Sequence, residues 1–185
     1  MVISEQVLID KCQNGNLKHF SEIYDLYIKK IYEFIYFKTH HKQIAEDLTS
    51  QTFLKSLENI RKYDFKKGKF SSWLYAIARN SVIDYYRTKK HDLNIDDAWD
   101  ISSKDNTMLD AENKEKIEKL KTHLKKLTGD QRDVIILRVW NDMSYGEISE
   151  IMGKSEANCK MIFSRATEKI RKEQIFAILL CLLLI

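Results

Sequence analysis

The residues best suited to a chemical task lie between Arg61 and Lys90, where nine lysines and arginines are interleaved with aromatic side chains. The aromatic positions are Tyr63, Phe65, Phe70, Trp73, Tyr75, Tyr85 and Tyr86. Cationic side chains neutralise phosphates, and aromatic faces stack on unpaired bases at about 1–3 kcal/mol per base. The pattern therefore favours single-stranded nucleic acid over an intact duplex, whose bases are not open to stacking.

The alternative is that these aromatic residues form a core and the lysines a solvated face. Trp73 and Tyr85 are expected to be largely core in either case. Phe65 and Phe70 lie in or beside a charged loop at residues 63–69, and there base contact is the stronger interpretation.

A second stretch, Met143 to Arg165, has the pattern of two short helices joined by a tight turn. Ser144 and Glu147 have the spacing of a capping box, and Gly153 allows the left-handed conformation of a sharp helix exit. Ser155 can cap the second helix. The stretch is therefore interpreted as a helix-turn-helix.

Apolar stripes support this interpretation, with Tyr145, Ile148, Ile151 and Met152 on the first helix and Cys159, Phe163, Ala166 and Ile170 on the second. The side left open carries Ser155, Lys160, Ser164 and Arg165. Such a face could read a DNA major groove. A plain helical hairpin in a bundle is the alternative.

The rest of the sequence predicts the helices that position these two stretches. There is no proline and there are only five glycines, and apolar residues recur at helical spacing almost throughout. We expect an all-α fold, with helices near residues 5–13, 17–39, 43–60 and 71–87 and apolar stripes at 117–127 and 128–138. His40 and His41 are expected to be a break, as a loop or solvated pair rather than metal ligands, because neighbours on a helix point to different faces.

Loss of periodicity after Thr88 predicts two helical domains, residues 1–90 and 113–174, joined by a flexible linker at 91–112. The linker has a net charge of −6, so the remainder of a chain with net charge +4 carries +10. Basic flanks indicate a polyanionic partner. The acidic strip is either a partial mimic of that partner or a solvated linker.

Nothing in the sequence pairs a nucleophile with a base, and no His or Cys spacing indicates a metal, so we predict neither an enzyme nor a cofactor. Cys12 and Cys159 fall at apolar positions and are expected to be buried, reduced thiols in the cytoplasm. Residues 175–185 are an unbroken apolar tail, too short to span a bilayer, which needs about 20 residues. Packing or association of this tail is favoured over contact with a membrane.

Three blocks resemble the extracytoplasmic-function (ECF, group 4) family of bacterial RNA polymerase sigma factors, across nearly all of residues 1–174. AEDLTSQTFL at 45–54 is similar to the family's A-E-D-L-x-Q-E-x-F-L. FSSWLYAIARN at 70–80, followed by DYYR at 84–87, is similar to F-x-x-W-L-x-x-I-A-R-N-x-x-x-D-x-x-R. Residues 127–171, with SYGEISEIMG at their centre, resemble the family's domain that binds the promoter −35 element.

The resemblance implies a specificity subunit that directs core RNA polymerase to promoters, with sigma region 2 at 1–90 and region 4 at 113–174. Contacts with core polymerase, at its β′ clamp, would come from Glu46, Asp47, Gln51 and Phe53. Recognition and melting of the −10 element would use Phe65, Lys66, Lys67, Lys69, Phe70, Trp73, Arg79, Asn80 and Arg87. The −35 duplex would be contacted by Ser155, Lys160, Met161, Ser164 and Arg165.

The resemblance also implies contact with the β flap, a linker that runs through polymerase channels, and an anti-sigma factor that could hold the protein at the membrane. The chain departs from the family in two places that bear on contacts. Ser50-Gln51 replaces Gln-Glu and removes a carboxylate from the docking face, and Met161-Ile162 replaces polar or basic residues of the recognition helix. The −35 sequence of the family therefore cannot be carried over to this chain.

Two other classes compete with this interpretation. A stand-alone helix-turn-helix repressor or activator would bind its duplex tightly without polymerase and would not need the 44–54 block. A helical adaptor that binds a membrane protein through its tail would leave the basic aromatic stretch without a purpose.

Overall fold

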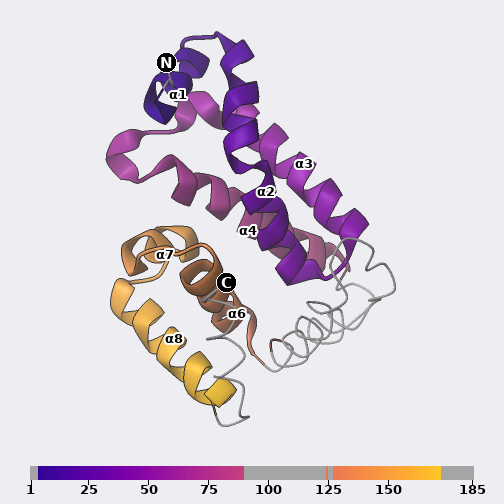
Figure 1. The fold of residues 1–185 in the computed structure, drawn as a ribbon, viewed down its shortest axis with the longest axis vertical. Coiled ribbons are helices and arrows are strands. Elements are labelled where there is room, and N and C mark those ends of the chain that lie inside the picture. The colour runs from indigo at the N-terminus through magenta and orange to yellow at the C-terminus, as the bar shows by residue number, and fades with distance from the viewer. Residues whose placement is uncertain (1–3, 90–123, 125–126, 172–185) are drawn as a thin grey trace. The chain divides into compact units, whose positions relative to one another are not determined.

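The computed structural model describes residues 4–89, 124 and 127–171 (Figure 1). The chain divides into two units, Met1–Ile101 and Ser102–Ile185, here called unit 1 and unit 2. Every regular element in the described ranges is helical, which confirms the all-α prediction. The linker at 91–112, the tail at 175–185, Lys90 and Cys181 lie outside the described residues.

Unit 1 begins with α1 (Glu5–Gln13), and a 3-10 turn at Leu17–His19 leads into α2 (Phe20–Thr39). α3 (Lys42–Asn59) is joined to α4 (Phe70–Lys89) by two more 3-10 turns, Ile60–Lys62 and Phe65–Lys67. α2 packs against α3 and α4, α3 packs against α4, and α1 lies against α2 and the turn after α3 (Figure 1). The predicted helices are therefore all present, and the last of them runs two residues further than expected.

Apolar residues at helical spacing form the core of unit 1, because each helix turns one stripe toward its neighbours. The most deeply buried members are Ile9, Ile23, Ile31, Phe34, Ile35, Leu74 and Tyr75. Tyr24 of α2 is 40% exposed. It lies at the edge of the core, where its ring covers Phe53 at 4.7 Å between centroids.

The two adjacent histidines separate α2 from α3, as predicted. His40 ends α2 in the left-handed conformation with φ of 49°. His41 caps α3, with its Nδ1 accepting a hydrogen bond from the backbone N–H of Ile44 at 3.4 Å. The expectation of a solvated pair is wrong for His40, which is only 9% exposed.

Unit 2 contains α6 (Gly129–Ile135), a π-helical turn at Ile136–Trp140, α7 (Tyr145–Met152) and α8 (Glu156–Arg171). Thr128 and Gln131 form a capping box at the start of α6. α8 packs against both α6 and α7 (Figure 1). The buried side chains include Leu124, Leu127, Val134, Leu137, Ile148, Ile151, Cys159, Ala166 and Ile170.

Cys12 and Cys159 are buried free thiols, as predicted, and burial raises the pKa of both. Across residues 4–89, 124 and 127–171, no group of three or more His, Cys, Asp or Glu side chains could hold a metal ion. In the same ranges, no helix is both long and apolar enough to cross a bilayer.

Candidate nucleic-acid interface

Tyr63 is the centre of an aromatic cluster between α3 and α4. It is only 6% exposed, and its ring centroid lies 4.8 Å from Phe65, 5.2 Å from Phe70 and 5.4 Å from Trp73. The contacts with Phe65 and Phe70 are edge-to-face, the geometry that aromatic quadrupoles favour. The cluster therefore fixes the segment that joins the two helices.

This segment, residues 60–69, is called the basic loop below. The Tyr63 hydroxyl donates a hydrogen bond to the carbonyl of Gly68 at 2.9 Å, and Asp64 accepts one from the N–H of Lys66 at 3.0 Å. Gly68 has φ of 146°, which a residue with a Cβ rarely adopts, so glycine is needed where the loop turns into α4. Hydrogen bonds thus close the loop on itself.

The side chains in and next to the basic loop differ in exposure. Lys62, Lys66, Lys67 and Lys69 are exposed, and Phe65 is half-buried. The prediction that Phe70 presents its ring to unpaired bases is wrong, because Phe70 is 3% exposed and lies among Tyr27, Tyr63 and Trp73. Trp73 and Tyr85, expected to be core, are half-buried.

A cavity of about 310 Å³ lies beside the loop, where α3, the turn after it and α4 meet. Its lining residues are Lys55, Asn59, Lys62, Trp73, Ile77 and Asn80. Lys62 Nζ donates to Asn59 Oδ1 at 2.8 Å, and Lys55 Nζ donates to Ser81 Oγ at 3.2 Å. The cavity thus combines an indole, two amides and two cations, which is a chemistry suited to a base and its phosphate.

Sequence reasoning placed Trp73 and Asn80 at this site but missed Lys55, Asn59 and Lys62. Lys62 lies inside the basic stretch. Lys55 and Asn59 belong to α3, and the one sign of a shared site in the sequence is their i, i+4 spacing, which places them on the same face of the helix. Only folding brings these α3 residues beside α4.

One stripe of α4 continues from the cavity, since Trp73, Ile77, Asn80, Asp84 and Arg87 recur every three or four residues. Arg87 is exposed and pairs with Asp84 at 2.9 Å. Arg79 is half-buried and lies about 100° around the helix from Asn80. The structure therefore brings Trp73, Asn80 and Arg87 to one face and leaves Arg79 outside it.

The outer face of α3 presents Glu46, Asp47 and Gln51, which are all exposed. Phe53 was predicted to join them as a polymerase contact, and this is wrong because Phe53 is 4% exposed. Its ring packs on Phe20 at 6.5 Å and on Tyr24 at 4.7 Å. Phe53 therefore holds α3 against α2, and the exposed apolar residue at this end of α3 is Leu54, at 56%.

A groove of about 400 Å³ runs between α2 and α3 beside this acidic face. Tyr24, Ile28, Lys29, Tyr32, Glu46, Thr49 and Ser50 line it. Burial, and then the charge of Glu46, raises the pKa of Tyr32, and both residues line this groove. Ile28 and Tyr32 were not singled out from the sequence, and folding brings them beside Glu46, Thr49 and Ser50 of α3.

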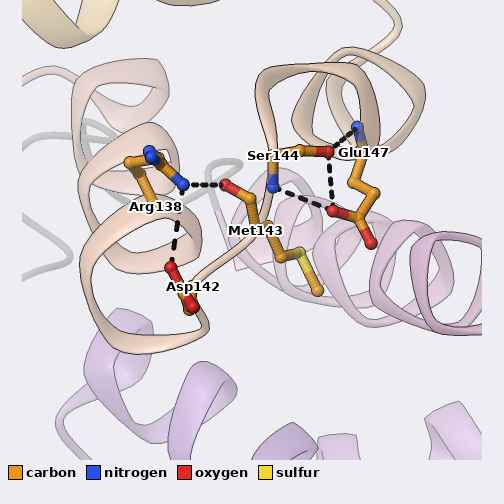
Figure 2. Close-up of polar contacts among 5 residues, drawn as sticks. All are labelled: Arg138, Asp142, Met143, Ser144 and Glu147. Carbon is orange, nitrogen blue, oxygen red and sulfur yellow. Dashed lines mark hydrogen bonds and ion pairs between the residues drawn. The ribbon is translucent and has the colours of Figure 1, made fainter.

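The helix-turn-helix of unit 2 has the caps that its sequence predicts (Figure 2). Glu147 Oε2 accepts hydrogen bonds from the Ser144 N–H at 2.8 Å and from the Ser144 hydroxyl at 2.7 Å. The Glu147 N–H in turn donates to Ser144 Oγ at 3.3 Å. α7 ends at Gly153 in the left-handed conformation with φ of 63°, and Ser155 accepts a hydrogen bond from the N–H of Asn158 at 3.2 Å.

α8 divides into a packed and an open face, as its apolar stripe predicts. Cys159, Ala166 and Ile170 are buried, whereas Phe163 is half-buried. The open face carries Ser155, Lys160, Met161, Ser164 and Arg165, all of them exposed, and Met161 is 43% exposed. The five predicted −35 residues are therefore accessible.

Arg138 fixes the chain that leads into α7, and sequence reasoning missed it. Its guanidinium donates to the carbonyl of Met143 at 2.9 Å and lies 3.8 Å from Asp142 (Figure 2). It also lies over the ring of Tyr145 at 5.4 Å, and Lys160 Nζ lies 5.6 Å from the same ring. Tyr145 thus links the start of α7 to a predicted DNA-contacting residue of α8.

Comparison with known proteins assigns the class. Residues 23–91 match the family described as Sigma-70 region 2, and residues 117–170 match the one described as Sigma-70, region 4. The chain is 33% identical over 151 residues to the ECF RNA polymerase sigma factor SigM of Bacillus subtilis, covering 81% of this chain and 91% of that one. It is 28% identical over 178 residues to SigW of the same organism, covering 89% and 94% of the two chains.

The fold agrees with solved structures. A structure of CnrH in complex with the cytosolic domain of CnrY matches with a TM-score of 0.72 at 19% identity, covering 92% of this chain and 96% of CnrH. The sigma factor RpoE of Bartonella quintana, solved with the anti-sigma factor NepR, matches with a TM-score of 0.67 at 22% identity, covering 84% and 96%. At these identities the likeness concerns the fold.

The two matched regions define a sigma-70-type transcription factor. The chain belongs to the ECF family of RNA polymerase sigma factors. Its relatives are sigma factors, which are not enzymes in the ordinary sense.

Proposed function

We propose that this protein directs core RNA polymerase to specific promoters and initiates transcription by binding the −35 duplex and melting the −10 element. Unit 1 would act as sigma region 2, with boundaries near residues 1–90, and unit 2 as region 4, with boundaries near 113–174. The intervening residues 91–112 would be the linker between them.

The observation that carries the proposal is the cavity beside the basic loop. Opening a duplex costs a few kcal/mol per flipped base, and stacking plus phosphate contacts must offset that cost. Trp73 and Asn80 supply a stacking surface and an amide, and Lys62 supplies a cation at the same cavity. Lys66, Lys67 and Lys69 would hold the displaced strand, with Phe65 as the half-exposed ring of the loop and Asn80 and Arg87 farther along α4.

The acidic face of α3 is the proposed docking surface for core polymerase. Glu46, Asp47 and Gln51 are exposed beside the groove formed with α2. Tyr24, Ile28 and Tyr32 add apolar area to a surface that is otherwise polar and acidic. Apolar anchors surrounded by charges are typical of stable protein interfaces.

The open face of α8 is proposed to read the −35 duplex. Lys160 and Arg165 can donate to guanine or phosphate, and Ser155 and Ser164 can donate or accept. Met161 has no hydrogen bond to offer and would make apolar contact with a thymine methyl group. An anti-sigma factor in the cytoplasm, of the kind solved with RpoE, is the further partner proposed.

A run-off transcription assay tests the proposal. Core polymerase is incubated with pooled genomic fragments, with and without the full-length protein, and transcripts are mapped. We expect new transcripts with defined start sites and a shared upstream element. Tight duplex binding without any new transcript would show a stand-alone helix-turn-helix regulator instead.

A further inference from the structure

α1 precedes the part of the chain that matches sigma region 2, which begins at residue 23. Its last residue, Gln13, nevertheless reaches the basic loop. The side-chain Nε2 of Gln13 donates to the carbonyl of Ile60 at 2.9 Å and to that of Tyr63 at 2.7 Å, across sequence separations of 47 and 50 residues. A primary amide has two N–H donors, and both are used here.

The two carbonyls lie where the basic loop begins. α3 ends at Asn59, and the carbonyls at the end of a helix have no partner within it. The Ile60 carbonyl also accepts a hydrogen bond from the Tyr63 N–H at 3.2 Å, which closes the turn through the backbone. The hydrogen bonds from Gln13 reinforce this same turn. The backbone on both sides of this turn is thereby tied to α1.

From Tyr63 the constraint extends through the whole loop. The Tyr63 ring contacts Phe65 and Trp73, and its hydroxyl binds the carbonyl of Gly68. The turn that Gln13 holds also carries Lys62, which lines the cavity. A displacement of the Tyr63 backbone would therefore move the ring, the loop closure and the cavity wall together.

α1 is itself fixed at its other end. The Tyr27 hydroxyl of α2 donates to Glu5 at 2.5 Å, and the Tyr27 ring lies 5.9 Å from Phe70. Burial, and then the bond to Glu5, raises the pKa of Tyr27, whose hydroxyl is the donor in that bond. α1 is thus a strut between α2 and the loop.

We propose that Gln13 is a positioning residue for the −10 strand: it touches no DNA, but it holds the basic loop in the conformation that captures unpaired bases. The inference rests on the proposed function of that loop. A loop that is already ordered loses less conformational entropy when it binds, so the clamp raises affinity through preorganisation. Without the hydrogen bonds from Gln13, the lysines of the basic loop would still be present, but the loop would no longer hold them in the binding conformation.

The test compares variants of the full-length protein bound to core polymerase. Gln13→Met has a similar length and no donor, and Gln13→Lys restores a donor that can reach two carbonyls. Asn14→Ala is the matched control, because Asn14 caps the same helix and its Nδ2 donates to the nearby Asp10 carbonyl at 2.9 Å rather than to the basic loop. The probe is a fluorescent single-stranded oligonucleotide that carries the non-template −10 sequence of a promoter mapped by run-off transcription.

We expect Gln13→Met to weaken oligonucleotide binding about 5- to 20-fold, the equivalent of two ordinary hydrogen bonds, and Gln13→Lys to recover most of it. Affinity for the −35 duplex and for core polymerase should stay within twofold of wild type. Hydrogen exchange at the Lys66 and Lys67 amides, which bond to Asp64, should accelerate while α3 and α4 keep their protection.

Three results would overturn the inference. One is oligonucleotide affinity unchanged in Gln13→Met, and another is a loss equal to that of Asn14→Ala. The third is a parallel fall of oligonucleotide, core and duplex affinity, which would mean that Gln13 only stabilises the unit. Wild-type protein that fails to bind the oligonucleotide would instead refute the proposed function, so the two failures are distinguishable.

Discussion

The basic loop of unit 1 and the helix-turn-helix of unit 2 are built by opposite means. The loop is held by residues distant in sequence, such as Gln13, whose contacts span 47 and 50 positions. The helix-turn-helix is held largely by neighbours, such as Ser144 and Glu147, which are three positions apart. The first site depends on tertiary packing and the second on local sequence. A substitution in the loop should therefore affect more of its unit than a substitution in a helix cap.

The largest effect is expected at Tyr63. Tyr63→Ala removes a buried ring with three aromatic neighbours, and such truncations cost about 3–5 kcal/mol. Tyr63→Phe keeps the ring and removes the hydroxyl that bonds to the Gly68 carbonyl, a loss of about 1 kcal/mol. Urea unfolding of both variants measures the difference, and equal losses would mean that the hydroxyl, rather than the ring, holds the loop.

Charge removal on the open face of α8 comes next. Lys160→Ala and Arg165→Ala should each weaken −35 duplex binding by about 1–3 kcal/mol, because each removes a contact to base or phosphate. Lys18→Ala, which removes an exposed charge from unit 1, is the control. Fluorescence anisotropy on a −35 duplex measures the three, and equal weakening by Lys18→Ala would show that net charge alone drives binding.

A smaller effect is expected from the cap of α7. Ser144→Ala removes the oxygen that accepts from the Glu147 N–H, which typically costs about 1 kcal/mol. Ser144→Thr keeps a cap oxygen and should lose less. Thermal unfolding of the two variants provides the measurement, and a loss in Ser144→Thr as large as in Ser144→Ala would contradict the local origin of this site.

The same contrast explains what the sequence could and could not predict. Capping boxes, the left-handed Gly153 and the open face of α8 follow from spacing along one or two turns, and the structure confirms them. The burial of Phe53 and Phe70 was missed. A sequence motif identifies which residues recur in a family, but it does not show whether each side chain faces the core or the solvent. Lys55 and Gln13 were missed for a related reason, since their hydrogen-bond partners are distant in sequence.

The central claim is that unit 1 handles single strands and unit 2 handles duplex. The most direct measurement uses the double variant Lys67→Ala/Lys69→Ala, bound to core polymerase, with a single-stranded −10 oligonucleotide and a −35 duplex as separate ligands. We predict about a tenfold loss for the single strand with a salt slope shallower by about 1.4, because two phosphate contacts are removed, and no change for the duplex. Equal loss of affinity for both ligands would contradict this division of labour.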